Sequence, residues 1–162
     1  QAPLAELKCN GSLRGRKGQL YEGGIRVPFI VNQPGKVKVQ ELDNLIYFPD
    51  VMPTLANLAR ATDKLPQRIN GMNILPLFYG HQVETNNRLL YWEFTGKQRA
   101  ARRGDWKVVS VKKDAPLELY HISKDMTEST NLAQDHPEIV KEFEQEMNKM
   151  RTPSPNWPLP NE

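Results

Sequence analysis

Residues 13–28 read Leu13-Arg14-Gly15-Arg16-Lys17-Gly18-Gln19-Leu20-Tyr21-Glu22-Gly23-Gly24-Ile25-Arg26-Val27-Pro28, and this stretch carries most of the information on the fold. It places Lys17 in a loop that glycines interrupt, and it then runs into an apolar segment, Val27–Val31. Glycine adopts backbone conformations closed to other residues and lets the chain pass close to a ligand. A single ammonium on such a loop suits an oxyanion, since loops on a rigid scaffold commonly carry function. The alternative is an ordinary surface loop on which Lys17 is merely solvated.

The order of residues in this stretch, Leu-Arg-x-x-Lys-Gly-x-x-Tyr-Glu-Gly-Gly-x-Arg-x-Pro, resembles the second signature of the type I sulfatases. These enzymes belong to the alkaline-phosphatase-like superfamily. Further blocks resemble the family in the same order and extend the likeness over nearly the whole chain: Phe29–Gly35, Phe48–Leu55, Gly71–Leu77, Arg102–Lys107, and Leu117–Asp125 with Glu128–Leu132.

The chain has 162 residues, enough for one domain or for a small domain with pieces of another. Its 38% apolar and 25% charged residues are ordinary for a soluble globular protein. A net charge of +3 does not by itself indicate nucleic-acid binding, and no apolar run approaches the length of a membrane span. The chain begins at Gln1 without an initiator methionine or a visible signal peptide, which suggests a mature form or a fragment. The resemblance favours a fragment.

The resemblance implies that the catalytic nucleophile and most metal ligands lie upstream of this chain. In the family, a Cys or Ser within C/S-x-P/A-x-R is converted to formylglycine, and the full-length protein binds Ca²⁺ or Mg²⁺. Cys9 does not fit that pattern, because neither Pro nor Ala stands two residues later and Arg14 is too far along. We therefore expect no cofactor within this chain, and we expect Cys9 to be a small buried side chain. A lone cysteine also excludes an internal disulfide.

The expected fold class is α+β, with a remnant of the large alkaline-phosphatase-like α/β domain followed by a small subdomain. Residues 1–87 are assigned to the large domain, residues 88–152 to the small subdomain, and residues 153–162 to a proline-rich tail. The resemblance implies the same division between the two domains.

Local patterns predict the elements of each part. In the large-domain piece, Val27–Val31 is expected to be a buried strand and Asp50–Ala61 a helix that Asp50 caps. The small subdomain is expected to hold four antiparallel strands at 88–94, 98–103, 106–112 and 117–122, with a tight turn at Gly104-Asp105. A final helix, capped by Asp135, should pack an apolar face against that sheet through Ile139, Phe143, Met147 and Met150.

The resemblance assigns the catalytic contact to Lys17, whose ammonium would bind the sulfate group. Sulfuryl transfer depends mainly on positioning and electrostatic stabilisation, by analogy with phosphoryl transfer, and a lysine supplies a compact point charge. Glu22, Gly23, Gly24 and Arg26 match motif positions that we expect to shape the loop. Glu22 and Arg26 are expected either to pair with each other or to hold the loop through hydrogen bonds to the backbone.

A basic cluster of Lys97, Arg99, Arg102 and Arg103 permits several interpretations. A solvated hairpin accounts for it most simply, and no recognised module supports nucleic-acid binding. Contact with an anionic glycan is plausible, and Arg99 and Arg102 are the predicted substrate-binding residues. His81, His121 and His136 are too scattered to predict a metal site.

The sequence thus predicts the C-terminal part of a sulfatase that hydrolyses aryl or carbohydrate sulfates and is inactive without its N-terminal catalytic part. One alternative is a phosphate or phosphonate monoester hydrolase of the same superfamily. Another is a non-enzymatic module that binds anionic glycans. The expected partners are the N-terminal part and a sulfated small molecule or glycan, with no nucleic acid and no membrane span. A periplasmic, lysosomal or secreted location follows from the resemblance alone.

Overall fold

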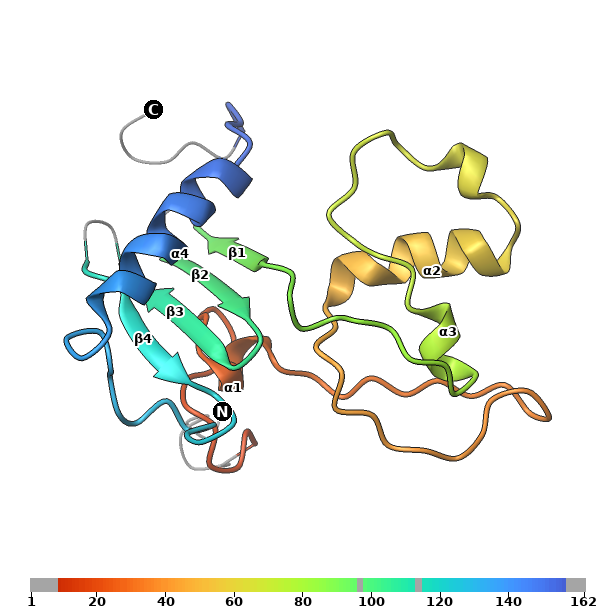
Figure 1. The fold of residues 1–162 in the computed structure, drawn as a ribbon, viewed down its shortest axis with the longest axis horizontal. Helices are drawn as coiled ribbons and strands as arrows, with labels where there is room; N and C mark the ends of the chain where they lie inside the picture. The colour runs from red at the N-terminus through yellow and green to blue at the C-terminus, as the bar shows by residue number, and fades with distance from the viewer. Residues whose placement is uncertain (1–8, 96–97, 113–114, 157–162) are drawn as a thin grey trace, which may run out of the picture. The chain divides into compact units, whose positions relative to one another are not determined.

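The computed structural model describes residues 9–95, 98–112 and 115–156 (Figure 1). These residues form two compact units. The first combines the chain up to Val27 with the chain from Arg88 onward, and the second is Pro28–Asn87. The expected boundary at residue 87 therefore coincides with a boundary between units. The segment around Lys17, in contrast, belongs with the C-terminal sheet and not with residues 28–87.

The first unit is built on a four-stranded sheet in the order β1-β2-β3-β4, with every neighbouring pair antiparallel. The strands are β1 (Leu90–Phe94), β2 (Gln98–Arg103), β3 (Trp106–Ser110) and β4 (Glu118–His121). Gly104 takes a φ of 56° in the tight turn between β2 and β3, a conformation that glycine adopts readily. The α+β class and the antiparallel sheet are confirmed.

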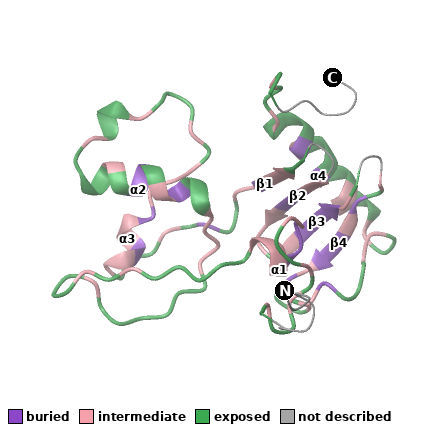
Figure 2. Ribbon diagram, turned by 180° about the vertical axis from the view of Figure 1, so that it is seen from behind, coloured by how far each residue is buried: buried purple, intermediate pink, exposed green. Residues whose placement is uncertain are grey.

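The two faces of the sheet bury different partners, because side chains alternate along each strand. On one face, Ala101, Val108 and Leu119 pack with Phe143 and Met147 of α4 (Pro137–Met150). On the other face, Ala100, Val109 and Tyr120 pack with Leu20 and Tyr21 from the N-terminal segment. Figure 2 shows the buried residues gathered on these strands. The sheet is therefore covered by α4 on one side and by residues 13–26 on the other.

The C-terminal helix packs through most of the predicted face, since Phe143 is 1% and Met147 0% exposed, but Met150 is 38% exposed and does not join the core. The expected cap is wrong. His136 occupies the N-cap position without a side-chain hydrogen bond, and Pro137 begins the helix. Proline suits the first helical position because its missing N–H would have no partner there. Of the expected tail, Pro158 and Pro160 lie outside the described residues.

The second unit is held together around Asp50 and Thr54. A 3₁₀ turn at Phe48–Asp50 leads into α2 (Val51–Leu58), and η2 (Thr62–Lys64) and α3 (Leu75–Phe78) follow. The helix is shorter than predicted, and the Asp50 side chain does not cap it. Asp50 accepts hydrogen bonds from the backbone N–H groups of Tyr47 and Met72, over 3.0 and 2.9 Å. Thr54 in turn accepts the N–H of Ile74 over 3.0 Å, which ties α2 to the segment before α3.

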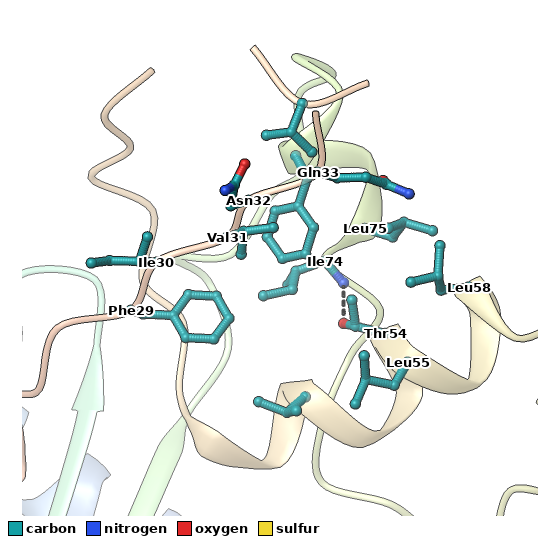
Figure 3. Close-up of a pocket in the computed structure, with 13 residues that line it drawn as sticks. Phe29, Ile30, Val31, Asn32, Gln33, Thr54, Leu55, Leu58, Ile74 and Leu75 are labelled. Atoms are coloured by element: carbon teal, nitrogen blue, oxygen red, sulfur yellow. Dashed lines mark hydrogen bonds between the residues drawn. The ribbon is translucent and has the colours of Figure 1, made fainter. Parts of the chain in front are cut away.

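The segment Val27–Val31 differs from its prediction as a buried strand. It lies outside every helix and strand, and Val27, Phe29 and Ile30 are 75, 50 and 87% exposed. An apolar run forms a strand only beside another strand, and no other described strand pairs with it. The exposed side chains of Leu55 and Leu58 on α2 join Phe29 in lining an apolar groove of about 400 Å³ within this unit (Figure 3).

Cys9 is exposed, so the expectation that it is buried is wrong. At residue 9 the chain has not yet reached the core of the sheet, which begins at Leu20. None of the described helices has the length and apolar content needed to cross a membrane.

Candidate functional site

Lys17 lies at the tip of a tight turn formed by residues 16–19. The backbone N–H of Gln19 donates to the carbonyl of Arg16 over 3.0 Å, and Gly18 has a φ of 87°. A positive φ at the third residue is what a type II turn requires, so the glycine after the lysine is fixed by the turn. Gln98 of β2 donates its side-chain amide to the carbonyl of Gly18 over 3.0 Å. The turn is therefore attached to the sheet next to Lys17.

We name residues 13–26 the lysine loop. Its two limbs, the residues before and after the turn at 16–19, meet at Gly23 and Gly24, at the start of the short helix α1 (Glu22–Ile25). A Cβ atom on Gly23 would lie 2.6 Å from the carbonyl oxygen of Arg14, and one on Gly24 would overlap the carbonyl oxygen of Gln19. Larger residues therefore cannot replace either glycine without moving the backbone. The absence of a side chain at Gly23 and Gly24 therefore lets the two limbs of the loop lie close together.

Side chains fix the loop from within and from the sheet. Asn10 donates its amide to the carbonyls of Gly15 and Gly23, over 2.9 and 2.7 Å, and so bridges the two limbs. Leu20 and Tyr21 are each only 5% exposed in the core of the sheet. These contacts hold the backbone on both sides of the turn at residues 16–19 and so restrict its conformation.

Arg14 packs against the tyrosines that join the loop to the sheet. Its guanidinium carbon lies 4.0 Å from the centre of the Tyr21 ring, and it donates to the hydroxyl of Tyr120 over 2.8 Å. Both tyrosine hydroxyls donate to Glu118. Burial, followed by these hydrogen bonds to Glu118, raises the pKa of both phenols. The charge of Arg14 is therefore engaged within this chain, by the loop and by the sheet.

A buried ion cluster lies beneath the loop. The ammonium of Lys107 on β3 lies 2.8 Å from a carboxylate oxygen of Glu22 and 2.8 Å from one of Glu128. Lys107 and Glu128 are both 0% exposed, and Glu22 is 3% exposed. Burial opposes ionisation of Glu22, but Lys107, Arg102 and Arg26 outweigh it and lower its pKa. For Glu128 burial prevails over Lys107, and its pKa is raised.

Glu22 also pairs with the arginine four residues later, since Nη1 of Arg26 lies 3.5 Å from its carboxylate. Of the two alternatives for Glu22 and Arg26, the structure therefore contains the direct ion pair. Arg102 reaches the same carboxylate over 3.6 Å and donates to the carbonyl of Gly104 over 3.0 Å. Its side chain is only 17% exposed, so its charge is turned inward.

The predicted substrate-binding residues are not brought together. Arg102 lies on the face of β2 that carries the lysine loop, whereas Arg99 lies on the α4 face and donates to Asn148 over 3.0 Å. Arg103, on the same face as Arg99, pairs with Glu142 and Glu146 on α4. Lys97 lies outside the described residues. A contact of Arg99 or Arg102 with substrate remains a prediction.

Lys17, by contrast, is exposed, and among the described residues its ammonium has no ion pair or hydrogen bond. Arg16 and Arg26 are also exposed on the same loop. The arrangement presents cations to solvent on a backbone that is fixed from below, and cations held in this way attract anions.

Comparison with known proteins identifies the group to which this loop belongs. A family model described as N-sulphoglucosamine sulphohydrolase, C-terminal, matches residues 16–153. The chain belongs to this sulphohydrolase C-terminal family. The predicted resemblance to sulfatases is thus confirmed, and all the loop residues singled out above from Lys17 onward lie inside the match.

Individual sulfatases support the assignment. A sulfatase from Formosa agariphila is 33% identical over 147 residues, covering 79% of this chain and 26% of that protein. An N-acetylgalactosamine-6-O-sulfatase from Bacteroides thetaiotaomicron is 30% identical over 155 residues, covering 88 and 30%. A protein solved in work on glycosaminoglycan metabolism by the same bacterium superposes with a TM-score of 0.74 and 27% identity, covering 86 and 32%. The chain thus spans less than a third of each of these proteins.

The sequence patterns missed Lys107 and Glu128, although both lie in blocks that resemble the sulfatases. One local signal existed for Lys107: it is a charged residue directly before Val108 and Val109 in an apolar strand, at a position where the alternation points inward. Glu128 offered no such signal, because it lies in a polar segment without periodicity. Its left-handed backbone, with a φ of 52°, became visible only in the structure.

Proposed function

We propose that this chain is the C-terminal part of a sulfatase and that the ammonium of Lys17 contacts the oxygens of the sulfate ester in the active site. The observation that carries the proposal is an exposed lysine without a partner among the described residues, at the tip of a turn whose base is fixed by buried contacts. The residues that flank the turn are buried, whereas the charge of Lys17 has no partner among the described residues. This combination suits a lysine that binds a ligand.

The chemistry of sulfate esters requires such a charge. The sulfuryl oxygens stay negative while further charge develops on the leaving oxygen, so a preorganised cation stabilises the transition state. Lys17 supplies that charge as a compact donor. Arg16, which is exposed on the same turn, adds positive potential and attracts the anion to it.

The rest of the reaction is assigned to other parts of the protein. We propose that the nucleophile, a formylglycine, and a Ca²⁺ or Mg²⁺ ion lie in a preceding N-terminal part. Within residues 9–95, 98–112 and 115–156, no group of His, Cys, Asp and Glu side chains is arranged to hold a metal ion.

The names of the relatives favour a carbohydrate substrate. Besides the N-acetylgalactosamine-6-O-sulfatase, a structure solved in complex with a neocarrahexaose superposes with a TM-score of 0.72 and 26% identity. We propose a sulfated glycan as the natural substrate, with aryl sulfates as laboratory substrates. A periplasmic, lysosomal or secreted protein would meet such glycans, and we propose one of these locations.

The test is turnover by the complete protein with Lys17→Ala. We expect kcat/KM for an aryl sulfate to fall by about 100-fold or more, the scale of losing one transition-state charge contact. Lys141→Ala is the matched control, because Lys141 is an exposed lysine on α4, on the opposite side of the sheet. Full turnover by Lys17→Ala would reject the role of Lys17.

Parallel assays separate the alternatives. If phosphate or phosphonate monoesters are hydrolysed faster than sulfates, the protein is a hydrolase of that class. If the complete protein turns over none of these esters but this chain binds sulfated oligosaccharide at low salt, the chain is a glycan-binding module.

A further inference from the structure

The buried ion cluster has no direct route to a substrate, since Lys107 and Glu128 are 0% exposed. Ionised groups are costly to bury, and a sheet that needed only stability could fill this position with apolar side chains. Lys107 lies in a central strand, with Arg102 and Tyr120 as its cross-strand neighbours. The contacts of the cluster indicate what it provides in place of apolar packing.

Glu128 contacts the lysine loop on both sides of the turn that carries Lys17. Its carboxylate accepts the backbone N–H of Glu22 over 2.7 Å, and its backbone carbonyl accepts a hydrogen bond from Arg14 over 2.8 Å. Arg14 precedes the turn at residues 16–19, and Glu22 follows it. One buried residue therefore fixes both limbs of the loop at once.

Lys107 connects this residue to the sheet. Its ammonium lies between the carboxylates of Glu22 and Glu128, at 2.8 Å from each, and its own backbone is held within β3. Without Lys107, the carboxylates of Glu22 and Glu128 would face each other in a buried site. The partners of Glu22 would then be the arginines at 3.5 and 3.6 Å. The cluster thus ties the position of the lysine loop to strand β3.

The segment that presents Glu128 is itself well ordered by hydrogen bonds. Asp125 accepts the backbone N–H groups of Ser129 and Thr130, each over 2.8 Å. Asn131 accepts the N–H of Leu119 on β4 over 3.0 Å. Glu128 therefore contacts the loop from a second support fixed to the same sheet.

We propose that Lys107 and Glu128 are positioning residues for Lys17, and that the buried cluster holds the lysine loop in the one arrangement in which that ammonium meets the sulfate. This inference rests on the proposed function of Lys17. It extends that function by assigning roles to residues that do not touch the substrate.

The test is a double-mutant comparison in the complete protein. Lys107→Met removes the buried ammonium and keeps the unbranched apolar part of the side chain, and we expect it to lower kcat/KM for an aryl sulfate by roughly 10- to 100-fold. In a Lys17→Ala background the same change should cost less than about threefold, because there is no longer an ammonium to position. Equal losses in both backgrounds, or no loss with Lys17 present, would overturn the inference. If Lys17→Ala alone keeps full turnover, the proposed function fails first and the inference falls with it.

A second measurement remains informative if Lys107→Met impairs folding. Glu128→Gln preserves the shape of the side chain; it removes the charge and replaces one of the two acceptor oxygens by an N–H donor, while the other oxygen can still accept the N–H of Glu22. We expect amide hydrogen exchange of residues 20–24 to accelerate by about tenfold or more in either variant, with Val108 and Val109 unchanged. Arg151→Met is the matched control, because it removes a buried cation from Glu93 on the α4 face of the sheet. Unchanged exchange in the loop of Glu128→Gln, or equal acceleration in Arg151→Met, would reject the positioning role.

Discussion

The backbone N–H of Gly23 donates to the carbonyl oxygen of Arg14 over 2.8 Å, and this bond closes the lysine loop at its base. A side chain on Gly23 would crowd the same oxygen. The loop is therefore closed by a contact that depends on the absence of a Cβ atom.

We expect Gly23→Ala to destabilise the protein by about 1–3 kcal/mol, because the limbs must separate to admit the methyl group. Turnover of a sulfate ester should fall with it. Gly11→Ala is the control: Gly11 has a φ of 59°, and a Cβ atom added there would meet nothing within 4 Å, so alanine costs about 1–2 kcal/mol through backbone strain alone. Urea unfolding and turnover measured on both variants would show whether activity follows the loop or overall stability. Equal turnover in the two variants would contradict the role given to this contact.

Thr54→Val tests how the second unit is held together. The change leaves the N–H of Ile74 without its acceptor in a buried site, since Thr54 is 4% exposed. We expect a loss of about 1–3 kcal/mol in the free energy of unfolding, measured by chemical denaturation. Thr62→Val, at an exposed position, should change it by less than about 0.5 kcal/mol. A similar loss in both variants would show that Thr54 contributes only through helix propensity.

Asp125 predicts a dependence of stability on pH. A hydrogen bond from the hydroxyl of Thr127, together with those from the Thr130 and Ser129 amides, lowers its pKa below the ordinary value of 3.8. A carboxylate with a lowered pKa stabilises the folded state above its unfolded-state pKa, and this contribution disappears as the pH falls through the folded-state pKa. The difference in unfolding free energy between the wild type and Asp125→Asn should be constant above about pH 5 and shrink in acid. In a Thr127→Val background that shrinkage should be smaller. A difference that is independent of pH would refute this account.

The exposed apolar segment before the Pro34-Gly35 turn predicts a partner surface in the complete protein. Ile30 is 87% exposed in this chain, so Ile30→Glu should leave the melting temperature of the chain within about 2 °C. If the N-terminal part covers this segment, the same change should lower the melting temperature of the complete protein by several degrees, because it buries a charge. Thermal unfolding of both proteins makes the comparison. No change in either would show that the segment stays exposed.

Local features of the fold could be predicted from the sequence. The Gly104-Asp105 turn, the strands on either side of it and the apolar face of α4 all depend on neighbours within a few residues. The Pro34-Gly35 turn is present for the same reason. The cap of α2 was mispredicted because the carboxylate of Asp50 accepts a hydrogen bond from elsewhere in the unit, from the N–H of Met72, 22 residues away.

The buried cluster could not be predicted, because it joins residues far apart in the chain. Lys107 and Glu22 are separated by 85 residues, and Glu128 and Glu22 by 106. No periodicity links positions at such distances. The exposure of Val27–Val31 could not be predicted either, because the apolar pattern describes the residues and not whether a neighbouring strand is present. The turn at Lys17 is a local feature of the same kind, because a turn only four residues long requires the glycine after the lysine.

Much of the support for the lysine loop comes from later in the chain, beyond the sixty or so residues of the second unit. During synthesis the loop therefore leaves the ribosome well before the strand and turn that hold it. A product that stops short of residue 128 would carry the lysine but lack the residue that binds both limbs of its loop. Premature termination before that point should abolish function as completely as loss of the nucleophile.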